Sequence, residues 1–146
     1  MIKLSTGLRE ELAVAGALKD VLDGGFLRLY SGPVPADADA ALSGVTLLNE
    51  ISAGGTGTPL TFEGTAPGGV LVKSVAETWT GDNLTGGTPT FFRYVLSGDA
   101  GDASSSAVRF QGSAGALGSD MFISVLPLVD EAPLSFSVFQ LTLPAQ

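Results

Sequence analysis

The stretch FLRLYSGPVPADADAALSGVTLL, residues 26–48, decides the fold that the rest of the chain must accommodate. It begins and ends like a β-strand, and we expect strands over residues 26–31 and 45–52. Pro33 and Pro35 end the first strand, because proline cannot donate to a strand ladder. Between them and the second strand, ADADAAL (residues 36–42) predicts one or two helical turns. The stretch therefore contains a long connection without a catalytic side chain, and its purpose is the first question that the sequence raises.

Similar strand signals recur along the chain, separated by loops rich in Gly, Pro and Ser. Alternation of side chains is clearest over residues 70–80, and TFFRYVL (residues 90–96) is a strongly aromatic strand. Further strands are expected at residues 60–63, 107–111 and 121–126, and from Pro133 onward. About seven or eight short strands predict a mainly β fold, a β-sandwich or jelly-roll-like domain preceded by one N-terminal α-helix. Residues 26–146 are expected to form this single β-rich domain.

The last strand changes its buried face partway along. Apolar side chains occupy even positions from Leu134 to Val138 and odd positions from Phe139 onward. Since side chains alternate strictly in a strand, this change requires a bulge or a change of the buried face. A strand that leaves one core for another contact, such as a subunit interface, would also produce it.

Residues 1–25 predict an arm followed by one helix. Ser5 or Thr6 can cap its N-terminus, and Gly24 with Gly25 can end it. Four leucines share one face of this helix: Leu8, Leu12, Leu18 and Leu22. Two interpretations follow. The helix packs on its own sheet, or the arm and helix dock on a neighbouring subunit.

The overall charge of the chain argues against several classes of partner. The 146 residues carry a net charge of −8, and the seven basic residues are scattered singly. A nucleic-acid-binding face needs clustered basic residues, so we expect no nucleic-acid partner, and an anionic membrane surface is disfavoured for the same reason. The start MIKLSTGLREEL does not resemble a signal peptide, and no apolar run is long enough to span a membrane. We expect no membrane partner and folding in a cytosol.

Candidate chemistry is sparse. The absence of His and Cys excludes Ser-His-Asp, Cys-His and thiolate or imidazole zinc sites. Two-carboxylate glycoside hydrolysis remains open for Glu50, Glu63 and Glu77, although solvent-facing strand carboxylates are the simpler interpretation. GDAGD (residues 98–102) resembles a polar turn more than a calcium loop. The strand aromatics are more typical of a core than of a sugar-binding patch. The sequence thus predicts no catalytic residues, no cofactor and no metal, and the chain is not expected to be an enzyme.

Three segments resemble a family of small proteins from the virion-structure region of tailed-bacteriophage genomes. They are LSTGLR (residues 4–9), GGFLRLYSG (residues 24–32) and PADADAALSGVTLL (residues 35–48). The C-terminal part, with GSDMFISVLPLV and FQLTLP, is similar to the end of that family. The resemblance implies a non-enzymatic component of the virion, assembled in the cytoplasm of a bacterial host. Its first implication is a capsid decoration (cement) protein that bridges major capsid subunits, and the alternative is a tail, collar or head-fibre adhesion component.

A decoration protein implies two partners, the major capsid protein and further copies of the chain in a homodimer or homotrimer. We expect the contacts to come from the arm, the proline-rich connection and the second half of the last strand. The candidate interface residues are Leu4, Leu8, Arg9, Tyr30, Pro33, Pro35, Phe139 and Leu141.

Overall fold

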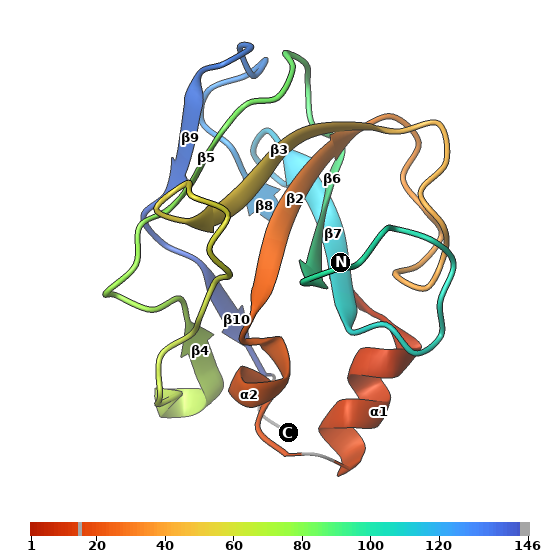
Figure 1. Cartoon of the computed structure of the whole chain (residues 1–146), viewed down its shortest axis with the longest axis vertical. Helices are drawn as coiled ribbons and strands as arrows, with labels where there is room; N and C mark the ends of the chain where they lie inside the picture. The colour runs from red at the N-terminus through yellow and green to blue at the C-terminus, as the bar shows by residue number, and fades with distance from the viewer. Residues whose placement is uncertain (15, 144–146) are drawn as a thin grey trace.

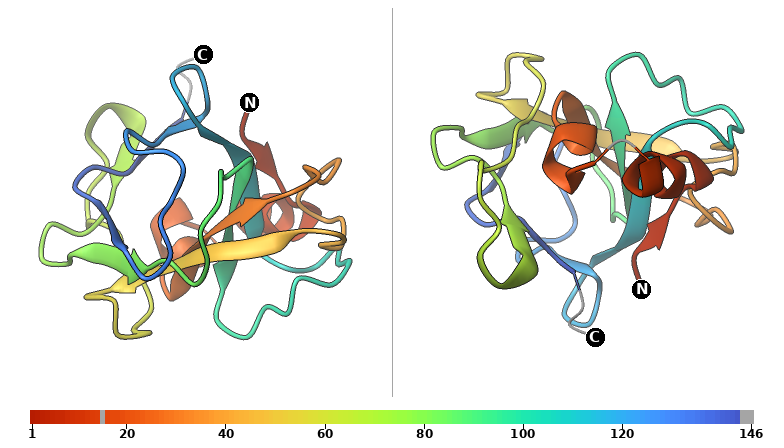
Figure 2. Two further views of the ribbon diagram at one scale, coloured as in Figure 1. Left: turned by 90° about the horizontal axis from the view of Figure 1, so that it is seen from above. Right: turned by 90° about the horizontal axis from the view of Figure 1, so that it is seen from below.

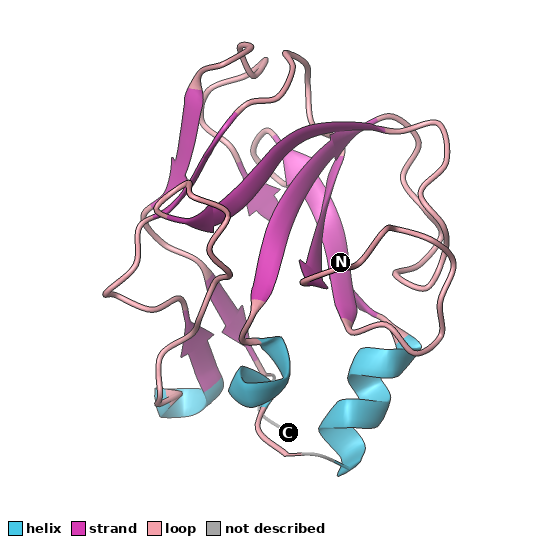
Figure 3. Ribbon diagram, viewed as in Figure 1, coloured by secondary structure: helices cyan, strands magenta, loops and turns pink. Residues whose placement is uncertain are grey.

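The computed structural model describes residues 1–14 and 16–143 and shows a mainly β fold with helical segments near the N-terminus (Figures 1 and 3). The helices are α1 (Thr6–Val14), α2 (Leu18–Leu22) and a 3₁₀ turn, η1 (Pro67–Gly69). The strands are β1 (Lys3–Leu4), β2 (Gly25–Ser31), β3 (Thr46–Ala53), β4 (Val70–Val72), β5 (Trp79–Asp82), β6 (Phe91–Leu96), β7 (Arg109–Gly115), β8 (Met121–Phe122), β9 (Pro133–Phe136) and β10 (Gln140–Thr142). The predicted mainly β class with an N-terminal helical segment is confirmed.

One large sheet holds eight of these strands in the order β1-β7-β6-β2-β3-β5-β9, with β8 beside β7. Its strand pairs are antiparallel except for β7 and β8. The sheet is strongly curved, and its strands surround the core when the molecule is seen along its long axis (Figure 2). A separate ribbon of β4 and β10 also packs on this core, so the arrangement is compatible with the predicted sandwich.

The opening stretch supplies the two central strands. β2 lies between β3 and β6, with Arg28 opposite Glu50 on one side and Arg93 on the other. Leu27 and Leu29 point into the core and are fully buried, whereas Arg28 between them faces the opposite side of the sheet. β2 is therefore paired along both edges, and it fixes the register of β3 and β6.

Aromatic rings fill the interior. Tyr94 and Phe110 stack with their centroids 4.9 Å apart, and Phe62 meets Trp79 edge to face at 5.3 Å. Trp79 is fully buried, which places the inner face of β5 in the same core. The four aromatics considered for an exposed sugar-binding patch, Trp79, Phe91, Phe92 and Tyr94, are all buried, so that alternative is wrong.

Several predicted elements have different boundaries in the structure. Residues 70–80 do not form one strand, because β4 ends at Val72 and β5 begins at Trp79. Residues 36–42 form a series of bends rather than helical turns, and the strand expected at 121–126 is limited to Met121 and Phe122. The change of face in the last strand corresponds to a break: β9 pairs with β5 in the main sheet, and β10 pairs with β4 in the ribbon.

The N-terminal segment packs on the chain's own sheet. Ser5 caps α1, since its hydroxyl accepts a hydrogen bond from Leu8 N at 3.1 Å. The helical region is divided into α1 and α2, and Gly16 between them has a φ of 119° that favours glycine. Leu8 and Leu22 are fully buried in the core, and Tyr94 Oη donates to the carbonyl of Leu22 at 2.7 Å. Of the two interpretations, packing on its own sheet is the one that the structure shows.

The burial of Leu8 gives a test of whether residues 1–25 belong to the same cooperative unit as the sheet. We expect Leu8→Ala to lower the free energy of unfolding by about 2–5 kcal/mol, because it leaves a cavity in the shared core. Val14→Ala, on the exposed side of the same helix, is the matched control and should change it by no more than about 0.5 kcal/mol. Denaturant unfolding followed by fluorescence and circular dichroism measures both. Two separate transitions in the wild type would show that the arm folds independently.

Candidate interaction surface

The carboxylates considered for glycoside hydrolysis are each engaged by neighbouring groups. Glu50 accepts a hydrogen bond from Arg28 Nε at 2.6 Å, and Glu63 accepts one from Val75 N. Glu77 accepts hydrogen bonds from Thr61 and from Trp79 Nε1. No group of three or more His, Cys, Asp or Glu residues that could hold a metal ion occurs among residues 1–14 and 16–143. These three carboxylates therefore hold neighbouring loops and strands in place.

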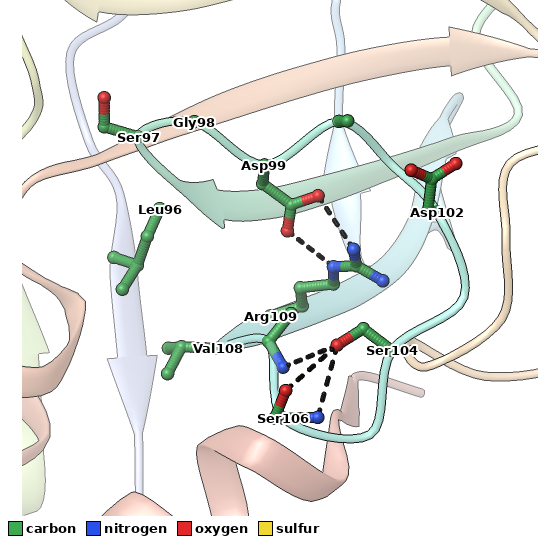
Figure 4. A pocket seen from close by; sticks show the side chains of 11 residues that line it. Leu96, Ser97, Gly98, Asp99, Asp102, Ser104, Ser106, Val108 and Arg109 are labelled. Carbon is green, nitrogen blue, oxygen red and sulfur yellow. Dashed lines mark hydrogen bonds and ion pairs between the residues drawn. The ribbon is translucent and has the colours of Figure 1, made fainter.

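A hollow of about 380 Å³ lies beneath the β6–β7 connection, and a buried ion pair forms one of its walls (Figure 4). Asp99 accepts hydrogen bonds from Arg109 Nε at 2.6 Å and Nη2 at 2.8 Å, and both side chains are at least nine-tenths buried. Because the Asp99 carboxylate is committed to Arg109, the GDAGD segment does not form a calcium loop. One wall of the hollow is therefore a structural ion pair.

A polar row crosses the outer face of the central sheet. Strand register places five side chains side by side across it, one each from β1, β7, β6, β2 and β3: Lys3, Gln111, Arg93, Arg28 and Glu50. Arg93 is fully buried and donates twice to Gln111 Oε1, at 2.7 and 3.2 Å. It makes no ion pair with a carboxylate among the described residues, so its remaining donors need other acceptors.

The long connection after β2 supplies those acceptors. We call residues 33–45 the lid, because they cover the part of the polar row formed by Lys3, Gln111 and Arg93. Arg93 donates to the carbonyls of Asp37 and Ala40, and Arg109 donates to that of Ala38. Every carbonyl from residue 35 to residue 40 accepts a hydrogen bond from outside the lid, the other donors being Gln111 Nε2, Lys3 Nζ and Ser104 N. This explains why the lid bends instead of forming helical turns: its carbonyls face the sheet.

Small side chains let the lid approach the sheet closely. Ala38 is fully buried against it, and Asp37 Oδ1 accepts hydrogen bonds from the N–H groups of Asp39 and Ala40, which stabilises the bend. Asp39 reaches the N-terminus of α1, where it accepts hydrogen bonds from the Thr6 N–H and hydroxyl. These bonds, the hydroxyl one foremost, lower the pKa of Asp39. The lid therefore connects the sheet to the first helix.

Burial and charge shape the ionisation of this cluster. Burial lowers the pKa of Arg93, and the nearby Arg109 guanidinium lowers it further. Burial alone would raise the pKa of Asp99, but hydrogen bonds and the charge of Arg109 outweigh it, and the pKa is lowered. Two ion pairs, Arg109–Asp99 and Arg28–Glu50, neutralise two of the three guanidinium groups, and the third is held by carbonyl and amide oxygens.

An apolar groove lies where the arm meets the last strand. We call it the arm groove; it has a volume of about 290 Å³. It is lined by Ile2, Leu4, Leu8, Leu12, Leu18, Leu22, Phe110, Gln140, Leu141, Thr142 and Leu143. None of these residues is charged, and Leu4 and Leu143 are 42% and 54% exposed. Exposed apolar surface of this kind, without charges at its walls, is typical of a contact with another protein.

Two further hollows continue this apolar surface toward β8 and β9. They have volumes of about 230 and 190 Å³, and they share Phe122, Phe136 and Val138. We call them together the seam groove, because they lie between β8 and β9, which come from opposite ends of the main sheet. Phe122 and Val138 are 57% and 70% exposed. The one charged residue of the lining, Asp120, is paired with the amino group of Met1 at 2.9 Å.

The eight candidate interface residues fall into three groups. Leu4, Leu8 and Leu141 line the arm groove, and Phe139 with Leu141 lines the seam groove. Leu8 and Phe139 form the floors of these grooves, since both belong to the core. The structure thus brings together residues from the two ends of the sequence that were predicted separately.

The other four candidate residues lie away from the grooves. Tyr30 is buried and stacks on Phe91 with centroids 5.0 Å apart. Pro35 contributes its carbonyl to Gln111, while Pro33 is exposed at the beginning of the lid. Arg9 is exposed on α1 and donates to Thr6 Oγ1.

Ile2, Phe122 and Val138 were not among the predicted interface residues. Phe122 and Val138 lie on segments whose alternation suggested ordinary strands, so their exposure depends on where those strands end. The signal available in the sequence was the absence of charge: residues 121–129 and 132–146 contain no Asp, Glu, Lys or Arg.

Comparison of the chain with protein-family models, curated proteins and solved structures found no match. Among residues 1–14 and 16–143, no helix has the length and apolar character needed to cross a membrane.

The Asp99–Arg109 pair predicts a specific loss of stability in acid. Folding lowers the pKa of Asp99, so its carboxylate stabilises the protein fully at any pH above the pKa of aspartate in the unfolded chain, about 3.9. That contribution is lost as the pH falls through the pKa of Asp99 in the folded protein. At pH 7 we expect Asp99→Asn to cost about 3–5 kcal/mol, because Arg109 is left buried without its partner. The difference from wild type should shrink below about pH 4. Denaturant titrations at several pH values measure this. Asp102→Asn, an exposed position in the same loop, should have little effect, and a pH-independent cost for Asp99→Asn would contradict the assignment.

The lid offers a second test within one short segment. Ala38→Leu should lower the free energy of unfolding by about 1–3 kcal/mol, because a larger side chain lifts the lid carbonyls from their arginine donors. Ala36→Leu adds the same atoms at an exposed position two residues away and should change it by no more than about 0.5 kcal/mol. Thermal and denaturant unfolding distinguish the two. Equal effects would mean that the lid does not pack closely on the sheet.

Proposed function

We propose that this chain is a non-enzymatic structural protein of a tailed-phage virion, and that it decorates the capsid by bridging major capsid subunits. The observation that carries the proposal is the arm groove, an uncharged apolar surface built from the N-terminal arm and the last strand. A chain with a net charge of −8 stays dispersed in water through its other surfaces, so this groove is suited to being covered in an assembly.

The attachment of the arm to the sheet supports a structural role. The arm is joined to the sheet by the register of β1 with β7, and Ser5 Oγ accepts from Arg109 N and donates to the carbonyl of Ala107. A docking surface held in this way loses little conformational freedom when it binds. The resemblance of residues 4–9, 24–32 and 35–48 to virion proteins of tailed phages points to the partner, the major capsid protein.

Decoration also explains how a modest groove can be sufficient. Each copy would bury a small apolar area, and the shell would be stabilised by many copies acting together. The protein would be assembled in the cytoplasm of the bacterial host and would then be located in the virion.

Copy number and location test the proposal directly. We expect quantitative mass spectrometry of purified virions to find roughly tens to hundreds of copies per particle, and electron microscopy to place the chain on the head. A few copies per particle, with density at the tail or collar, would support the alternative tail, collar or head-fibre role instead. Absence from purified particles would exclude both.

The role of the arm groove in capsid binding is tested by introducing an aspartate into the groove and, as a control, an aspartate outside it. Leu4→Asp should weaken binding to capsids assembled without this protein by roughly tenfold or more, because a carboxylate would be buried without a partner. Val75→Asp adds the same charge at an 84% exposed position outside the groove and should bind like wild type. Co-sedimentation with capsids measures binding, and thermal unfolding confirms that both variants fold. Equal binding by the two variants would show that the capsid contacts another surface.

A further inference from the structure

The free edge of β9 is the longest uncharged strand edge at either end of the main sheet. β9 pairs with β5 on one side and, among the described residues, with no strand on the other. Its length is four residues, whereas β1 and β8, which flank the other end, have two each. An unpaired strand edge presents N–H and C=O groups that can pair with another strand.

The register shows which groups of β9 are unpaired. Thr78 O accepts from Gly54 N, on the β3 side, and Asn83 N donates to Ala132 O, on the β9 side. Because backbone groups alternate along a strand, Trp79 and Gly81 face β9, where their partners are Phe136 and Leu134. The N–H and C=O of Ser135 therefore point away from β5, at the free edge, and Ser135 is an exposed residue.

Natural edge strands are usually protected by charges or by proline, and β9 has little of either protection. No charged residue occurs from residue 132 to the end of the chain. Pro133 protects only the beginning of the strand, since it has no N–H group. The side chains beside the edge, Val138 and Phe122 of the seam groove, are more than half exposed.

We propose that β9 pairs with β9 of a second copy, antiparallel about a two-fold axis through Ser135, so that the main sheets of the two copies become continuous. Ser135 would exchange both backbone hydrogen bonds with Ser135 of the other copy. On the core face, Leu134 of each copy would lie opposite Phe136 of the other. On the outer face, the Ser135 hydroxyl already bonds Thr80 Oγ1 at 2.7 Å, and the pairing would extend this polar row across the dimer.

The charge distribution favours a second copy as the occupant. The carboxylates nearest to the edge are Asp82, opposite Pro133 on β5, and Asp130 and Glu131, in the turn before β9. Antiparallel pairing about Ser135 sends these turns to opposite ends, roughly 30 Å apart at about 3.3 Å per residue. That distance exceeds the Debye length of about 8 Å in physiological salt, so two acidic chains can meet here without strong repulsion. Since each copy uses its single β9 edge, the contact closes as a dimer and does not extend into a fibre. This inference does not depend on the proposed function.

The oligomeric state of the purified full chain tests the proposal. We expect light scattering after size exclusion to give a dimer mass at high micromolar concentration. Ser135→Lys should raise the dimer dissociation constant by roughly tenfold or more, because it sets two like charges directly opposite each other at the centre of the contact. Ser105→Lys, which adds the same charge at an exposed serine of the β6–β7 connection, should leave the dimer intact. A monomeric wild type, or a dimer that Ser135→Lys does not weaken, would overturn the proposal.

The absence of cysteine from the chain allows a second test of the register itself. In Ser135→Cys the two thiols would face each other at a separation that a disulfide can span, so mild oxidation should yield a cross-linked dimer. Ser105→Cys should remain monomeric on a denaturing gel. Dimers that form in solution but are not cross-linked through position 135 would contradict pairing about this residue.

Discussion

Three guanidinium groups on the outer face of one sheet are the constraint on which the rest of this structure depends. Arg93 and Arg109 are buried, and a buried guanidinium must have acceptors for its donors or it destabilises the fold. Arg109 pairs with the Asp99 carboxylate and also donates to a lid carbonyl, that of Ala38. Arg93 is bound by the Gln111 side chain and by two lid carbonyls, those of residues 37 and 40. The lid can present those carbonyls only in a bent, non-helical conformation with small side chains. The sequence PADADAA is therefore explained by its backbone carbonyls, which accept hydrogen bonds from arginines more than fifty positions away in the chain.

This dependence also shows what could be predicted from the sequence and what could not. The central strands β2, β3 and β6 follow from their own composition, and the structure places them within one residue of the expected bounds. The lid does not follow from local sequence. Alanine favours a helical turn and aspartate can cap one, but donors from remote parts of the chain, above all the arginines of β6 and β7, bind the lid carbonyls instead. Tertiary hydrogen bonding overrides local propensity here.

The same reasoning applies to the two long alternating segments. Residues 70–80 have one continuous pattern, yet the pairing stops after Lys73, which still forms a bridge with Phe62. The amino group of Lys73 is bound by the carbonyls of Ser74 and Glu77. Residues 134–143 carry a change of phase, and the structure resolves it as two strands in two sheets. A change of phase was visible in the sequence, but its cause depends on β4 and β5, which are remote from it. The alternation of a strand shows which side chains share a face and does not show where the strand ends.

Only part of the two grooves could be predicted from the sequence, because the exposure of a side chain depends on where its strand ends. Leu4, Leu8, Phe139 and Leu141 were inferred from the arm and the last strand separately, and the structure unites them because β1 and β10 lie at the same open side of the core. Phe122 and Val138 complete that side, and their exposure could not be deduced from alternation. The distribution of charge is the more informative signal. Asp37, Asp39 and Asp99 serve a turn, a helix N-terminus and the arginine cluster, and residues 132–146 contain no acidic residue. An acidic chain that keeps one edge and one groove free of charge has surfaces there on which neighbouring subunits can pack without electrostatic repulsion.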